Sequence, residues 1–183
     1  MRVLPGVGGY HPCKAVPQSR TGGSASAMST AASSTAERSS AAVVRIHGHV
    51  AEPLELTVQH PRRLPEQRVT VSFDCLKEGP QFHDFEGPTL WDVLRTIGPS
   101  PDYAARKQRS RLLLTVTGAD EHCAVLSWGE VDPEFGGQRI LLATSIDGLP
   151  LDSAGPQLVV PADVCGARYI SGIRAVWVGP AAC

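Results

Sequence analysis

Short runs in which apolar and polar residues alternate fill most of the chain from Val43 onward. In the run 68–75, Val69, Val71 and Phe73 are separated by polar residues, the pattern of a half-buried β-strand. Comparable strand-forming runs cover residues 43–50, 54–58, 81–87, 111–118, 122–132, 139–148, 156–163 and 167–179. We expect the run 122–132 to end in a turn, the run 139–148 to end in a hairpin turn, and a loop to follow Pro161. Apolar residues spaced three or four positions apart, as in a helix, are rare between these runs. The sequence therefore predicts an α+β domain, mainly antiparallel, with a few short helices and no repeating β-α-β order.

The clearest helix signal covers residues 90–97. Thr89 is a candidate N-cap, and Asp92 lies three residues beyond it, as in a capping box. Apolar residues recur three and four positions apart through this segment, and Gly98 followed by Pro99 ends it. Residues 61–67 and 101–110 are expected to be loops or single helical turns.

The composition changes at residue 43. Residues 1–42 are rich in Ser, Ala, Thr and Gly, and they are predicted to be a disordered tail before a globular domain over residues 43–183. Met28 within this tail is a candidate translation start. No internal repeat is visible.

Charge and cysteine content limit the function classes. The formal net charge is −1, so no electrostatic argument favours nucleic acid or an anionic membrane. The five cysteines are odd in number and contain no CxxC pair, which favours a reducing compartment over a disulfide framework. No signal peptide and no apolar run of about 18 residues is present, so we expect a cytoplasmic protein.

Two motifs suggest metal or thiol chemistry. Cys75 ends a predicted strand just before a polar loop, where Lys77 would favour a thiolate; the alternative is a buried small side chain. His47 and His49 are two residues apart on a predicted strand, so both imidazoles could face one zinc ion. The alternative is a pair of exposed histidines on an edge strand.

Three further polar groups have simpler interpretations. Residues 117–122 have the composition of a hairpin turn. Asp84 and Glu86 are expected to be solvated carboxylates on an exposed strand. Gly166, Ala167 and Arg168 suit an anion site, because glycine permits close backbone approach and the arginine fork matches phosphate.

Taken in order, these segments resemble the molybdopterin-binding domain of the sulfite oxidase family. The resemblance extends over residues 44–178. It is carried by the runs VVRIHGHVAEPLELTV, LPEQRVTVSFDC, FEGPTLWDVLRTIGP, AVLSWGEVD, ILLATSIDGLPL and PQLVVPADVCGARYISGIRAVWV.

The resemblance implies a molybdenum–molybdopterin cofactor. Cys75 would supply the sulfur that binds molybdenum, and Gly166, Ala167 and Arg168 would hold the pterin phosphate. The implied reaction is oxygen-atom transfer on a small oxyanion or sulfoxide, with an electron-transfer partner. Family members usually continue from the cysteine into an Ala-Gly-Asn-Arg run, where this chain has residues 76–79, Leu-Lys-Glu-Gly. Ser171 stands where the family often has a lysine.

These departures leave a second hypothesis open, a cofactor-free binding or interaction module on the same fold. Such a module would use a pocket, or the surface around Trp91, Trp128 and Trp177, to hold a ligand or partner. Core packing is the expected alternative role for Trp91 and Trp177.

Overall fold

The computed structural model describes residues 42–75 and 79–182, with the side chains of Phe73, Asp74 and Cys75 excepted. The predicted tail, apart from Ala42, and the candidate start Met28 lie outside the described residues. The strands are β1 Val43–Gly48, β2 Leu54–Thr57, β3 Gln67–Cys75, β4 Gly79–Gly87, β5 Leu112–Gly118, β6 Cys123–Ser127, β7 Leu141–Ala143, β8 Ser145–Ile146, β9 Leu149–Pro150, β10 Gln157–Val159 and β11 Ile173–Pro180. The helices are α1 Leu90–Ile97, α2 Arg106–Arg109 and α3 Trp128–Val131, and the 3₁₀ turns are η1 Pro61–Arg63, η2 Pro101–Tyr103 and η3 Gly166–Arg168.

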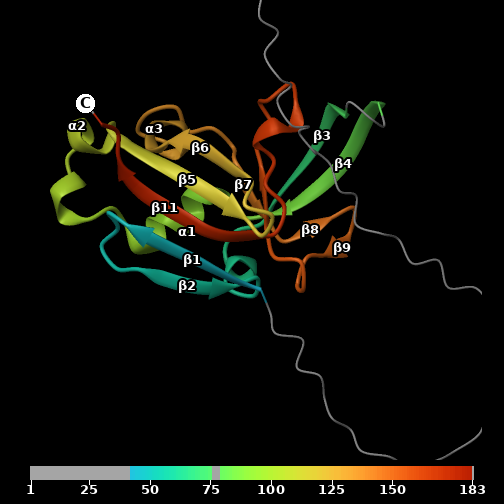
Figure 1. Ribbon diagram of the computed structural model, residues 1–183, viewed down its shortest axis with the longest axis horizontal. Coiled ribbons are helices and arrows are strands. Elements are labelled where there is room, and N and C mark those ends of the chain that lie inside the picture. Colours follow the sequence, from blue (N-terminus) through green and yellow to red (C-terminus); the bar gives the residue numbers. More distant parts are fainter. Residues whose placement is uncertain (1–41, 76–78, 183) are drawn as a thin grey trace, which may run out of the picture. The chain divides into compact units, whose positions relative to one another are not determined.

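These elements confirm the predicted α+β class. A five-stranded sheet has the order β2-β1-β11-β5-β6, and it is antiparallel except where β1 and β11 run parallel (Figure 1). Alternate residues of each strand, such as Val44 and Ile46 of β1 or Val176 and Val178 of β11, are buried on one face. This face forms the larger hydrophobic core.

Helix α1 confirms the strongest helix prediction. The Thr89 hydroxyl accepts a hydrogen bond from the Asp92 backbone N–H at 3.0 Å, and Gly98 ends the helix with φ +67°. Leu90, Val93 and Leu94 are buried in the larger core. Burying each such side chain contributes about 1.5–3 kcal/mol, so the amphipathic stripe rather than helix length stabilises α1.

A second sheet, of order β3-β4-β8-β9, has its own smaller core. The long β3–β4 hairpin pairs from Gln67 with Gly87 to Cys75 with Gly79. Its inner residues pack with β7, β10 and the segment after η3; the buried members are Val69, Val71, Phe85, Leu141, Ala143, Val159 and Tyr169. Asp147 and Gly148, both with positive φ, form the predicted hairpin turn between β8 and β9.

The tryptophans differ from expectation. Trp128 is fully buried at the start of α3, where a turn was predicted, and Trp91 is half-buried against it with ring centroids 6.0 Å apart. Trp177, expected in the core, is 37% exposed. The prediction for Trp177 was wrong because its neighbours Val176 and Val178 face the core, so the strand periodicity turns Trp177 to the other side. In the described residues no helix is long and apolar enough to span a membrane.

Candidate functional site

The Gly-Ala-Arg motif forms η3, in the segment between β10 and β11. The Arg168 guanidinium donates to both carboxylate oxygens of Asp163, from Nε at 2.8 Å and from Nη2 at 2.6 Å. Its Nη1 donates to Oε1 of Glu130 at 3.0 Å. We call Glu130, Asp163 and Arg168 the Arg168 clamp. Hydrogen bonds from Arg168 to Asp163 and then to Glu130 are the main causes that raise the pKa of Arg168 above its ordinary value.

The Arg168 clamp changes what a phosphate would meet at this motif. Two carboxylates surround one guanidinium, so the formal charge of the clamp is about −1. The paired donors that would fit a phosphate already bind Asp163. A phosphate therefore fits Arg168 only if Asp163 is displaced. The assignment of Gly166, Ala167 and Arg168 to a cofactor phosphate stays a prediction.

Cys75 lies at the far end of β3, where its backbone pairs with Gly79 of β4. The side chain of Cys75 and residues 76–78, with Leu76 and Lys77, lie outside the described part, so the thiolate assignment stays a prediction. The fold does bring the two candidate motifs to neighbouring elements, because η3 lies beside β3. The Tyr169 ring next to η3 is 6.3 Å from the Phe85 ring on β4.

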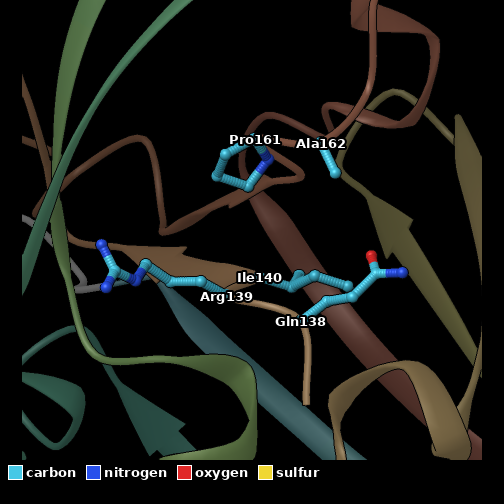
Figure 2. A pocket seen from close by; sticks show the side chains of 5 residues that line it. All are labelled: Gln138, Arg139, Ile140, Pro161 and Ala162. Carbon is cyan, nitrogen blue, oxygen red and sulfur yellow. The ribbon is translucent and has the colours of Figure 1, made fainter. Parts of the chain in front are cut away.

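A small open pocket adjoins the Arg168 clamp. The segment 138–140 before β7 forms one wall, and Pro161 and Ala162 after β10 form the other. The cavity measures about 320 Å³. Figure 2 shows Pro161 and Ala162 above the segment, with the side chains of Arg139 and Gln138 extending in opposite directions along it.

Arg139 was missed by the sequence reasoning. The segment 139–148 was interpreted as a strand and turn, and nothing in that pattern distinguishes Arg139 from any other exposed arginine. The distinguishing property is tertiary: within residues 42–75 and 79–182, Arg139 has no ion pair and no side-chain hydrogen bond.

The His47–His49 pair gains no support as a zinc site. Gly48 between the histidines has φ +101°, so the extended backbone ends there. The His49 ring packs edge-on against Tyr103 at a centroid distance of 5.2 Å. In the part of the chain that the structure describes, no three His, Cys, Asp or Glu residues gather as metal ligands.

The carboxylates on β4 are paired rather than simply solvated. Arg68 binds Asp84 at 2.7 Å and Glu86 at 3.3 Å, and the Thr70 hydroxyl donates to Asp84 at 2.5 Å. Hydrogen bonds from Thr70 and then Arg68 lower the pKa of Asp84. The predicted β5–β6 turn is confirmed, with the Asp120 side chain accepting from the His122 N–H. These groups complete hairpins.

The fold is similar to that of a sulfane dehydrogenase. The crystal structure of the sulfane dehydrogenase SoxCD from Paracoccus pantotrophus superposes with a TM-score of 0.59 at 19% sequence identity. The match covers 74% of this chain and 37% of that chain. No family model and no curated protein matches the sequence. At this identity the likeness shows the fold alone.

Burial of Tyr169 predicts a loss of stability at alkaline pH. Its side chain is 9% exposed, its hydroxyl donates to the Val160 carbonyl at 3.2 Å, and burial raises its pKa from 10.0 to about 12. The protonated phenol is thus favoured by the fold. The stability that the folded protein gains from the protonated Tyr169 is fully present below pH 10 and is lost as the pH rises through about 12.

The matched variant is Tyr169→Phe. We expect it to cost about 1 kcal/mol near neutral pH, because one hydrogen bond is lost, and to show a smaller decline above pH 10. Urea unfolding at pH 7, 10 and 11 measures both effects. An equal alkaline decline in the wild type and the variant would assign it to other groups.

Proposed function

We propose that this domain is a molybdopterin-dependent oxidoreductase domain acting on a small oxyanion or sulfoxide. The observation that carries the proposal is the fold shared with a protein named as a dehydrogenase. The ordered resemblance of residues 44–178 to the sulfite oxidase family supports it. So does the position of η3, the Gly-Ala-Arg element, beside β3, the strand that Cys75 ends.

The cofactor would be held by two kinds of group. Cys75 is the proposed metal ligand, since a thiolate is a soft donor. Bound molybdopterin would supply two-electron oxygen-atom transfer. Oxidation of an oxyanion would take its oxygen from water and pass two electrons to a partner protein, whereas reduction of a sulfoxide would release its oxygen as water and take two electrons and two protons from a donor. The pterin phosphate is the group that this site holds less favourably. Binding it at Arg168 requires the guanidinium to release Asp163.

The remaining proposals concern partners and compartment. A small-molecule substrate and an electron-transfer partner follow from the reaction class. The net charge of −1 provides no electrostatic attraction for nucleic acid or anionic lipid. The described cysteines Cys123 and Cys165 are both free and exposed, which suits a reducing, cytoplasmic location.

Cys75→Ser is expected to abolish molybdenum binding. We would express the full chain in a host that makes the cofactor, and measure molybdenum by mass spectrometry and pterin by its fluorescence after denaturation and oxidation. The wild type should hold about one molybdenum per chain, and the variant should lose most of it because a serine hydroxyl is a harder, weaker ligand.

Cys123→Ser and Cys165→Ser are the matched controls. Both remove an exposed free thiol from the described part of the domain. They should keep wild-type metal content. If all three variants retain molybdenum, Cys75 is not the ligand; a folded wild type with neither metal nor pterin contradicts the enzyme proposal itself.

One observation favours the second candidate, a cofactor-free binding module. The Arg168 clamp already neutralises the predicted phosphate anchor with Glu130 and Asp163. A tryptophan-lined surface does not carry this candidate, because Trp128 is buried. The pocket between residues 138–140 and 161–162 is its natural ligand site. A colourless, folded protein without molybdenum is the result expected of this module.

A further inference from the structure

We propose that the pocket between residues 138–140 and 161–162 binds a small oxyanion, with Arg139 as the charged contact and Arg168 as a positioning residue. Here a small oxyanion means a sulfate-, phosphate- or carboxylate-like group. The proposal goes beyond the molybdopterin function, because it concerns a site without metal ligands and holds whether or not molybdenum binds.

The first wall of the pocket is tied to α3. The Gln138 N–H donates to the Glu130 carbonyl at 2.6 Å, and the Ile140 N–H donates to the Gln138 carbonyl at 2.9 Å. Glu130 itself belongs to the capping box of α3: its side chain accepts from the Ser127 N–H at 2.6 Å. The backbone that carries Arg139 is therefore fixed at both sides.

The second wall leads directly into the Arg168 clamp. Pro161 and Ala162 come just before Asp163, whose N–H donates to the Val160 carbonyl at 3.0 Å and closes a tight turn. Arg168 binds the Asp163 carboxylate through two hydrogen bonds and the Glu130 carboxylate through one. Arg168 thereby links Asp163, which follows the second wall, to Glu130, whose carbonyl binds the first wall, while its own charge is used within the clamp.

Arg139 is an unpaired cation that lines the pocket. Most of the described arginines have a carboxylate partner; the paired ones are Arg45, Arg62, Arg68, Arg95, Arg106, Arg109 and Arg168. Arg63, Arg111 and Arg174 also have no ion pair within the described residues, but of the four unpaired arginines only Arg139 lines the pocket. Figure 2 shows its side chain running along the pocket wall. A guanidinium fork binds oxyanions through paired, charge-assisted hydrogen bonds.

The other lining groups suit a small anion. Ile140, Pro161 and Ala162 carry no carboxylate that would repel an anion. A cavity of about 320 Å³ is at the lower end of small-molecule sites, which span roughly 300–1,000 Å³.

Calorimetric titration with sulfate and with phosphate tests the proposal. The full chain is used at low ionic strength and constant pH. We expect saturable binding, weakened about tenfold or more by Arg139→Gln, because a charge-assisted hydrogen bond is lost. Arg174→Gln is the matched control, because Arg174 is exposed and also has no ion pair within the described residues. It should change the affinity by less than about twofold.

Arg168 variants separate positioning from direct contact. In the wild type, titration should shift the NMR signal of the Arg139 side-chain N–H. Arg168→Lys keeps the charge but not the paired geometry, and it should weaken binding while the Arg139 signal still shifts. Arg139→Gln with wild-type affinity overturns the proposal, as does an absence of saturable binding. Loss of binding in Arg168→Lys with no shift at Arg139 would place the anion at Arg168 instead.

Discussion

Gly48→Ala is expected to destabilise the domain by about 3 kcal/mol or more. Gly48 ends β1 with φ +101°, a conformation that costs L-residues about 1–3 kcal/mol. A methyl group there would also overlap the Val178 carbonyl oxygen of the neighbouring strand and lie 3.1 Å from the Trp177 ring. Relieving that overlap requires the β1–β11 pairing to open, which adds an overpacking cost of about 1–3 kcal/mol.

Gly148→Ala isolates the backbone part of this effect. Gly148 also has positive φ, at +75°, but a methyl group there would meet nothing within 4 Å. This variant should cost about 1–2 kcal/mol. Urea unfolding followed by tryptophan fluorescence and by circular dichroism measures both variants. Equal destabilisation of the two would show that the contact between Gly48 and β11 is unimportant.

Trp128→Ala is expected to cost about 3–5 kcal/mol. Trp128 is fully buried, stacks edge-on with Trp91, and donates from its indole N–H to the Asp132 carboxylate at 2.9 Å. Removing the indole creates a large cavity and withdraws a donor from Asp132, which is 1% exposed.

Trp128→Phe divides this loss between packing and hydrogen bonding. Phenylalanine keeps much of the volume, so most of its cost reports on the buried Asp132 carboxylate. The other close partners of this carboxylate are the Glu134 backbone N–H at 2.9 Å and Arg109 at 3.2 Å. Trp91→Ala, at a half-buried position, should cost less than Trp128→Ala. Chemical unfolding compares the three variants. A Trp128→Ala protein within 1 kcal/mol of the wild type would contradict this account of the core.

Local signals explain which parts of the fold were predictable. The β3–β4 hairpin, the capped helix α1 and the Asp147–Gly148 turn each follow from neighbouring residues. The parallel pairing of β1 with β11 does not, because it joins segments from opposite ends of the described sequence. The outward orientation of Trp177 depends on the strand register, which periodicity shows only once the core face is known.

The site residues stay predictions, and the structure adds the pairing of Arg168, which the sequence did not show. The sequence marked Cys75 and residues 166–168, and the structure places their elements β3 and η3 side by side. The partners of Arg168 could not be found, because Glu130 fell in a segment interpreted as a turn and Asp163 in a loop. Arg139 became a candidate only when the structure placed it on the wall of the pocket, with no ion pair to any described residue.

The position of β11 in the sheet has a consequence for synthesis of the protein. β11 is the last described strand, yet it lies between β1 and β5. Until it leaves the ribosome, β1 and β2 can form strand pairs only with each other, and the edge of β1 that pairs with β11 stays open. Contacts between such distant segments slow folding. The nascent chain should therefore depend on chaperones over this interval, and truncation before Ile173 should yield an aggregating product rather than a smaller domain.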